Sequence, residues 1–266
     1  MKDLLASDTQ IVDLSRPMVV GMPQSPNHPE YRLSMPRRHG DKVRADGGSA
    51  ANDLLVSGTH VGTHIDALGH VSHCGELHGG VDADAAQAGG RLNRLGVEEI
   101  APILARGVLL DVAALHGVDV LAGGHEITPD ELDAACDRVG VRVGAGDVIL
   151  IRSGWGRHWD DAEAFVGRET GVPGVGEAGA RWCAAREPVA VGADTIAFEC
   201  IRPGEGHATL PAHRVLLVEA GVYIIETMAL DELAALDATE FAVVVAPLHL
   251  VGATGSPVRP LAILGG

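Results

Sequence analysis

The second half of the chain alternates apolar runs with helix signals, and this order restricts the possible folds more than any other feature. Three runs rich in branched side chains predict buried strands: RGVLLDVAAL at 106–115, GDVILIRSGW at 146–155 and PVAVGADTIAFE at 188–199. Helices are predicted between them, at 127–140 and at 176–186. Because strands that alternate with helices join a common sheet, the pattern predicts an α/β domain with a mixed sheet and helices on at least one face.

The helix at 127–140 has clear start signals. Thr128 is expected as its N-cap, Pro129 as its first helical residue, and Glu131 stands at the capping-box position. Further elements follow along the chain: a helix at 212–220, a strand at 222–227, a helical turn at 229–235 and a final strand at 241–250 before the tail. Since no linker, repeat or low-complexity tract interrupts the chain, we expect a single domain over residues 1–266.

The N-terminal part has a different character. A short strand is predicted at 10–14, and residues 21–38 follow with four prolines, which exclude a helix and disfavour a regular strand. A long loop of this kind is usually functional. We therefore expect the segment 21–38 to be a lid that contacts substrate or an arm between subunits, with a plain surface loop as the alternative.

Charge and cysteine usage exclude several classes of protein. With 20 Lys plus Arg against 36 Asp plus Glu, the formal net charge is −16, which disfavours binding to nucleic acid or to an anionic membrane. No apolar stretch has the length of a membrane span or a signal peptide. The four cysteines stand singly, so we expect reduced thiols and a cytoplasmic protein.

Histidine is the residue that points to chemistry, with 13 copies against eight aromatic residues. Its densest cluster is HVGTHIDALGH, which contains His60, His64, Asp66 and His70. Imidazole and carboxylate groups together suit zinc, manganese or iron. The glycines and β-branched residues around His60 and His64 disfavour a helix, so we expect a tight loop to bring the ligands together. The alternative is that these histidines lie partly exposed around a turn, with their hydrogen bonds satisfied, and bind no metal.

Two later residues could complete such a site. His213 begins the segment HRVLL, and Glu226 ends the apolar strand predicted at 222–227. A carboxylate at the edge of a core must be paired, protonated or bound to a metal, because burying it alone costs several kcal/mol. A salt bridge to arginine is the alternative for Glu226, and Glu199 raises the same question with less support.

The segment HVGTHIDALGH matches the H-x-G-T-H-x-D-x-x-x-H signature of the metal-dependent cyclase family. This family includes bacterial kynurenine formamidases, isatin hydrolases, trans-dienelactone hydrolases and some polyketide cyclases. Looser similarities extend from IVDLSRPMVVGMP near the N-terminus to PLHLVGATGSPVRP near the C-terminus, so the chain resembles the family along nearly its whole length. Leu68 stands where formamidases commonly have proline, and the longer chain is more similar to isatin-hydrolase-like members.

The resemblance implies a fold and a set of roles. The fold is expected to be the swivelling β/β/α domain of kynurenine formamidases, assembled as a homodimer or homotetramer. His60, His64 and Asp66 correspond to metal ligands, and His70 corresponds to the catalytic acid/base. His213 and Glu226 align with the further ligands of members that bind two metal ions. One or two Zn or Mn ions per chain are therefore expected.

A metal-dependent hydrolase of an amide, lactam or formamide C–N bond is the function this resemblance favours. A bound ion polarises a carbonyl and lowers the pKa of its water to roughly 7 in favourable zinc sites. His70, with the ordinary imidazole pKa near ~6.5, is expected to take the proton and return it to the leaving group. The alternatives are a lactone hydrolase of the trans-dienelactone type, a polyketide cyclase, and a metal-binding scaffold without activity.

Two neighbouring features have two interpretations each. His73 and His78 lie beyond the signature and are expected to support the ligands or to be surface residues. Trp155 and Trp159 either line the substrate cavity, together with the histidine between them, or pack the core.

Overall fold

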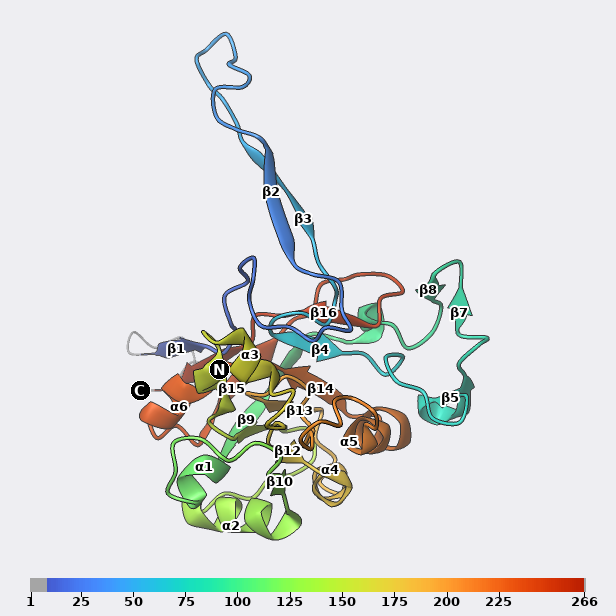
Figure 1. The fold of residues 1–266 in the computed structure, drawn as a ribbon, viewed down its shortest axis with the longest axis vertical. Helices are drawn as coiled ribbons and strands as arrows, with labels where there is room; N and C mark the ends of the chain where they lie inside the picture. Colours follow the sequence, from blue (N-terminus) through green and yellow to red (C-terminus); the bar gives the residue numbers. More distant parts are fainter. Residues whose placement is uncertain (1–8, 266) are drawn as a thin grey trace.

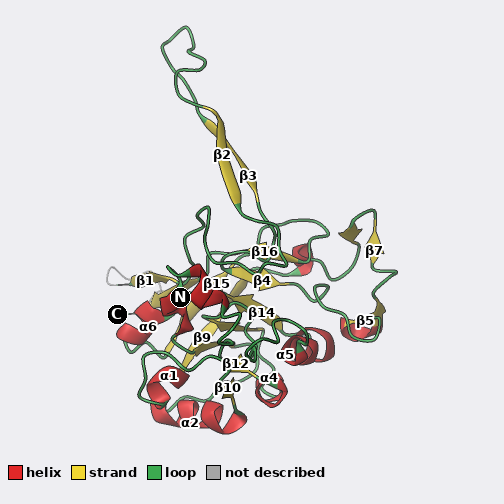
Figure 2. Cartoon of the chain, in the orientation of Figure 1, coloured by secondary structure: helices red, strands yellow, loops and turns green. Residues whose placement is uncertain are grey.

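The computed structural model describes residues 9–265 and confirms an α/β fold built on a mixed sheet (Figures 1 and 2). The main sheet has nine strands. In spatial order they are β1 (Gln10–Asp13), β17 (Leu261–Leu264), β15 (Glu240–Val245), β9 (Ile103–Asp111), β11 (Val148–Arg152), β13 (Ala190–Ala193), β14 (Tyr223–Glu226), β4 (His64–Asp66) and β16 (Gly255–Pro257).

The centre of the sheet is parallel and its two sides are antiparallel. Strands β9, β11, β13 and β14 pair in parallel, as the alternation of strands and helices predicted. On one side, β15, β17 and β1 are added antiparallel, and on the other side β4 and β16 are antiparallel to their neighbours. The sheet therefore brings a strand from the histidine cluster next to β14.

The four predicted helical segments are confirmed as α2 (Pro129–Val139), α4 (Glu177–Ala184), α5 (Pro211–His213) with a π-helix over Arg214–Ala220, and α6 (Asp231–Ala235). Two further helices, α1 (Val112–Leu115) and α3 (Ala162–Val166), were not predicted, and α1 lies in the segment 106–115 that was expected to be a strand. Strand β9 ends at Asp111, whose carboxylate caps α1 by accepting a hydrogen bond from the Ala114 N–H. Thr128 caps α2, Pro129 begins it, and Glu131 completes the capping box, as predicted. The helix predicted at 212–220 is present, with a wider π turn over most of its length.

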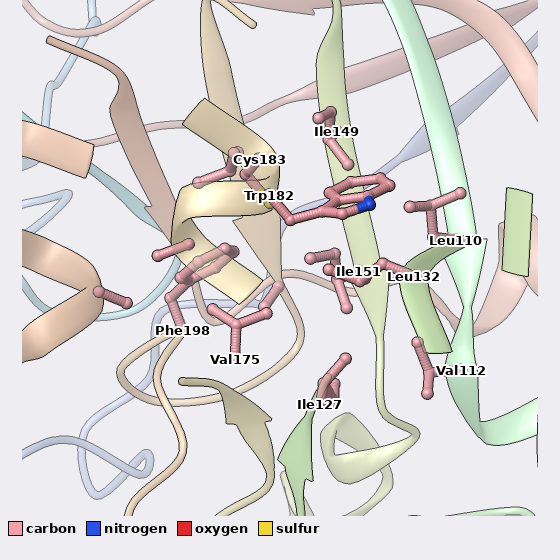
Figure 3. Packing of buried hydrophobic residues seen from close by; sticks show 14 of the residues in the cluster. Leu110, Val112, Ile127, Leu132, Ile149, Ile151, Val175, Trp182, Cys183 and Phe198 are labelled. Atoms are coloured by element: carbon pink, nitrogen blue, oxygen red, sulfur yellow. The ribbon is translucent and has the colours of Figure 1, made fainter. Parts of the chain in front are cut away.

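Two hydrophobic clusters fill the two faces of the sheet. On β11, Ile149 and Ile151 belong to the cluster that also contains Leu132 of α2 and Trp182 of α4 (Figure 3). The intervening β11 residues Val148 and Leu150 belong to the other cluster. Neighbouring side chains of a strand point to opposite faces, so a sheet buried on both faces needs the continuous apolar runs seen in the sequence.

The segment 21–38 departs from the prediction of a strandless loop. Residues Arg32–Arg37 form β2, which pairs antiparallel with β3 (Asn52–Val56) in a hairpin arm that projects from the body (Figure 1). The register shifts between Ser34 and Arg37, and Pro36 lies in this irregular part. Proline has no N–H to donate, and a bulge is one of the few places where a strand tolerates it.

The tail also contains more structure than predicted. The strand at 241–250 was expected to be the last, but it ends at Val245 and two strands follow it. Strand β16 pairs with β4, and β17 inserts between β15 and β1. Both are short and lie among glycine and proline residues, which explains why the local pattern did not predict them.

The remaining elements are short. They are η2 (His78–Gly80), η3 (Val97–Glu99) and η4 (Trp155–His158), the parallel pair β10 (Glu126–Ile127) and β12 (Gly174–Val175), and the hairpins β5 (Glu76–Leu77) with β6 (Val81–Asp82) and β7 (Gln87–Ala88) with β8 (Arg91–Leu92). Within residues 9–265, no helix has both the length and the apolar composition needed to cross a membrane. Cys136 and Cys183 are buried, Cys74 is exposed, and none of the four cysteines within residues 9–265 forms a disulfide.

Candidate metal centre

Strand pairing places three of the proposed ligands on one face of the sheet. In the antiparallel pair β14 and β4, Glu226 lies opposite His64, and Ile224 lies opposite Asp66. His64 and Asp66 are two residues apart on one strand, so their side chains share a face, whereas Ile65 between them packs into the core on the other face. The pairing therefore gathers residues that are far apart in the sequence.

His60 reaches the same face from the preceding turn, which is not helical, as predicted. Its Nδ1 lies 2.7 Å from Asp66 Oδ1, and its Nε2 lies 2.8 Å from the Thr254 hydroxyl. Gly62 adopts a left-handed φ of 68°, and its carbonyl accepts a hydrogen bond from His64 Nδ1 at 2.8 Å. Gly62 thus orients an imidazole through its carbonyl group. A donor fixed at one ring nitrogen leaves the other free to bind a metal.

His213 arrives from the end of α5 and is held by Glu199. The backbone N–H of His213 donates to Glu199 Oε1 at 2.7 Å, and Nδ1 lies 2.8 Å from the same oxygen. This contact leaves His213 Nε2 facing Asp66 and Glu226, at 3.6 and 3.2 Å. Glu199 is therefore paired with His213 and supports it, which is one of the three outcomes considered for this carboxylate.

The ligand atoms form a buried cage with unsatisfied oxygens. Asp66 Oδ2 and Glu226 Oε1 are buried and accept no hydrogen bond within residues 9–265, although imidazole nitrogens lie close to both. The ligand atoms of His60, His64 and Asp66 lie within 4.8 Å of one another. Buried carboxylate oxygens without partners are costly, and a cation between them would satisfy them. Nitrogen and oxygen donors in this number fit a divalent transition metal.

Charges inside the cage shift the pKa values in opposite directions. Burial lowers the pKa of His64, but hydrogen bonding to Glu226 and the charge of Asp66 outweigh burial and raise it to about 9. Burial raises the pKa of Asp66, but the imidazoles of His70 and His60 hold it well below its usual range. Burial and Asp66 raise the pKa of Glu226, but hydrogen bonds to His213 and His64 outweigh them and lower it. The two carboxylates therefore favour positive charge between them, which a divalent metal ion would supply.

His70 lies at the edge of this cage. Its ring stacks on His60 with 3.9 Å between the ring centroids, and its nitrogen lies within 4.8 Å of ligand atoms of Asp66 and His213. Burial, followed by the neighbouring imidazoles of His60 and His213, lowers the pKa of His70 to about 3, although Asp66 opposes this shift. The expectation that His70 titrates near its ordinary value is therefore wrong for the metal-free protein, in which the ring is neutral at pH 7.

A cavity of about 220 Å³ opens onto the centre. All six residues proposed from the sequence lie at or beside it, and His60, His64, His70, His213 and Glu226 line it directly. Its other walls include His28, Ile196 and Leu210. His28 comes from the segment 21–38, so this segment does reach the cavity, as the lid hypothesis expected.

Several site residues were not found from the sequence. His28 stacks 5.4 Å from His60, His207 lines the cavity, and Thr254 contacts His60. His28 and His207 stand alone in loops, and a single histidine or threonine carries no spacing pattern, so only the fold places them.

The two tryptophans and two histidines that had two interpretations, Trp155, Trp159, His73 and His78, are packing or surface residues. Trp155 is buried and donates from Nε1 to the Phe165 carbonyl at 2.8 Å, and Trp159 packs edge-on against the Phe165 ring. His73 is exposed, and His78 binds the Val218 carbonyl at 3.0 Å, away from the cavity.

Comparison with known proteins identifies the family. The sequence matches the Cyclase family over residues 12–200, and the chain belongs to that family. An isatin hydrolase from Roseibium aggregatum is 27% identical over 268 residues, which cover 98% of this chain and 94% of the relative.

Solved structures give the same result. A crystal structure described as a novel cyclase has a TM-score of 0.85 and 30% identity, covering 97% of this chain and 89% of its own. An isatin hydrolase bound to the product analogue thioisatinate has a TM-score of 0.75 at 22% identity, covering 100% and 96%. The expected fold of the family is therefore confirmed. The likeness to isatin hydrolase supports a hydrolase, and the cage of His60, His64 and Asp66 supports a divalent metal.

Proposed function

We propose that the protein is a metal-dependent hydrolase that cleaves the C–N bond of a small amide, lactam or formamide. The observation that carries this proposal is the buried cage of two carboxylates and three imidazoles at the base of a cavity that His70 also lines. Zn²⁺ or Mn²⁺ in this cage would polarise a substrate carbonyl and lower the pKa of a water molecule.

His70 is proposed to accept and return the proton of the attacking water. His70 is neutral at pH 7, so an imidazole nitrogen can accept a proton during the attack of water on the carbonyl. The same nitrogen can then return the proton to the leaving nitrogen. General acid–base help of this kind contributes typically ~10²–10⁴-fold in rate.

Asp66 belongs to two groups of candidate ligands. His60, His64 and Asp66 make one group, and the other side of Asp66 faces His213 Nε2, with Glu226 close to both. His60, His64, Asp66, His213 and Glu226 are thus proposed as ligands of one or two Zn or Mn ions. His70 also lies within reach of the Asp66 and His213 side. We assign it to catalysis because its ring is less buried than the others and lines the cavity.

The cavity favours a compact substrate. Its volume of about 220 Å³ is below the usual ~300–1,000 Å³ of ligand pockets, and no Phe, Tyr or Trp is among its described lining residues. Isatin, the cyclic amide after which the relatives are named, and other small lactams are the first compounds to test. A lactone hydrolase is the second candidate, because the same cage would activate an ester carbonyl.

Steady-state rates on a lactam and a lactone with the same ring test the proposal. A higher kcat/KM on the lactam is expected, and the reverse preference would favour the lactone hydrolase. Cyclisation of a polyketide intermediate, with no hydrolysis of either ring, would contradict both. If the protein is only a metal-binding scaffold, none of these compounds reacts while the metal remains bound.

We further propose that the active assembly is a homodimer or homotetramer joined through the hairpin arm. Leu33 and Leu55 are opposite each other on β2 and β3, and they are 50% and 56% exposed. An isolated two-stranded hairpin is marginally stable in water, and a row of exposed apolar side chains usually marks a contact surface. A second copy of this chain would cover these side chains.

A further inference from the structure

A second group of metal-ligating side chains lies outside the cavity, where α1 meets α2. His116 directly follows α1, His125 precedes β10, and Glu131 is in the first turn of α2. Nε2 of His116 and Nε2 of His125 lie 2.5 and 2.8 Å from the same oxygen, Glu131 Oε1. None of the three residues lines the cavity of the first centre.

The position of the carboxylate is determined by the start of the helix. Glu131 Oε2 accepts hydrogen bonds from the backbone N–H and the hydroxyl of Thr128, at 2.7 and 2.9 Å. The capping box therefore occupies one oxygen and directs the other toward the two imidazoles. Burial raises the pKa of Glu131, but the hydrogen bonds from Thr128, His116 and His125 outweigh burial and lower it to about 2.

We propose that His116, His125 and Glu131 form a second, peripheral site for one transition-metal ion such as Zn²⁺, Cu²⁺ or Ni²⁺. Two imidazole nitrogens and one carboxylate oxygen are donors that these ions prefer. The three ligand atoms lie within 4.8 Å of one another, and the two rings are 5.2 Å apart in an edge-on arrangement.

The geometry needs only a small adjustment to admit an ion. Ligands about 2.0–2.1 Å from a tetrahedral ion are about 3.3 Å apart, so the N–O separations must widen by less than about 1 Å. Both imidazoles can make this movement, because the side chains of His116 and His125 are 39% and 29% exposed. The same exposure lets an ion enter from solvent and leaves its remaining coordination positions to water.

A bound ion would connect the end of α1 to the start of α2. These helices also pack together in the core that covers one face of the sheet. An ion that binds only the folded chain stabilises it in proportion to the logarithm of its concentration. The site is therefore expected to raise the thermal stability of the enzyme without any effect on catalysis at the first centre.

Metal titration of the protein with its first centre already loaded tests the inference. Calorimetry with Zn²⁺, and separately with Cu²⁺, should detect one further equivalent in the wild type. This equivalent should disappear in the double variant His116→Ala/His125→Ala and persist in the control His39→Ala/His249→Ala, which removes two exposed histidines elsewhere. Glu131→Gln keeps a side-chain oxygen for the capping box, and it should weaken binding by about 10-fold or more while the fold is retained.

Thermal unfolding supplies a second measurement that does not depend on activity. Added Zn²⁺ should raise the Tm of the loaded wild type and of the control variant, but not that of the His116→Ala/His125→Ala variant. No further equivalent in the wild type, or an equivalent that survives in that variant, would overturn the inference. The cluster would then be only a hydrogen-bonded contact between the two helices.

Discussion

His64 and Glu226 are register partners on adjacent antiparallel strands, and His64 Nε2 lies 3.3 Å from Glu226 Oε2. Side chains of directly opposed residues lie on the same face of a sheet, so the pairing of β4 with β14 builds the centre of the cage. Asp66 joins from two residues further along β4, while β16 pairs on the other side of that strand. The ligands of the metal centre are thus brought together by the order of the strands as well as by the spacing within the histidine signature.

Glu199 should control the affinity for the metal through His213. In Glu199→Gln the hydrogen bond to His213 Nδ1 becomes neutral, so the ring is oriented less firmly and its Nε2 is a weaker ligand. We expect about 10–100-fold weaker metal binding with the fold retained, measured by competition with a chelator. Glu205→Gln changes an exposed glutamate close by and serves as the control. Equal affinities in the two variants would contradict the assigned role.

Gly255 should be essential for the position of His60. A Cβ at this position would lie 2.5 Å from His60 Cε1 and 2.9 Å from the Ile65 carbonyl oxygen, so the imidazole must move away. We expect Gly255→Ala to lose metal and activity, with a stability cost of about 1–3 kcal/mol. Gly144→Ala places its Cβ in open space and should change neither metal content nor stability. Full metal content in Gly255→Ala would show that His60 is not a required ligand.

The stability of the metal-free protein should fall as pH rises from about 6.5 to 9. The pKa of His64 is raised from 6.5 to about 9, so its stabilising proton is fully present below pH 6.5 and is lost as pH approaches 9. The loss is at most about 3 kcal/mol. Thermal unfolding of chelator-treated protein measures it, and His64→Gln should reduce the dependence. His213 should carry the remainder, because burial lowers its pKa but hydrogen bonds to Asp66, Glu199 and Glu226 outweigh burial and raise its pKa as well. A Tm that is constant over this range in the wild type would contradict the assignment.

Metal retention should follow the opposite trend with pH. Protons compete with the ion for the imidazoles, so dialysis at about pH 5 should release metal that remains bound at neutral pH. Metal per chain, measured after dialysis at both pH values, checks this expectation. Unchanged content at the lower pH would argue against histidine ligands.

Charges placed on the arm should prevent self-association. Leu33→Glu with Leu55→Glu puts two like charges opposite each other on a surface that a second copy is expected to cover. Light scattering during size exclusion should show a lower oligomer than in the wild type. Leu236→Glu, an exposed leucine outside the arm, is the matched control and should leave the mass unchanged. The arm has no role in assembly if all three proteins have the same mass.

Local sequence patterns predicted the central strands, whose residues form apolar runs, and the helices with clear start signals. The strands around Leu150 and Ile224 were predicted because both faces of a central parallel sheet are apolar, and α2 was predicted from Thr128 and Pro129. The strand β2 of the arm was missed because Pro36 normally argues against a strand, and the bulge that accommodates it depends on pairing with β3. Strands β16 and β17 were missed because they exist only as partners of strands distant in the sequence.

The site was also predicted only in part, where a local spacing or the family resemblance identified its residues. The spacing of His60, His64 and Asp66 is local and was readable, and His213 and Glu226 followed from the family resemblance. No local pattern could predict that Thr254 supports His60 or that His28 reaches the cavity, because these contacts arise from loops brought together by the sheet. The lowered pKa of His70 likewise depends on burial and on neighbouring imidazoles.

The most direct test of this account is the metal content of the purified protein and three variants, measured by elemental analysis in moles per chain. We expect one or two equivalents in the wild type, loss in His60→Ala, and partial or complete loss in Glu226→Ala. His70→Ala should keep its metal while kcat falls by about 10²–10⁴-fold. A wild type without metal after expression in metal-supplemented medium, or loss of metal from His70→Ala with full retention in His60→Ala, would contradict it.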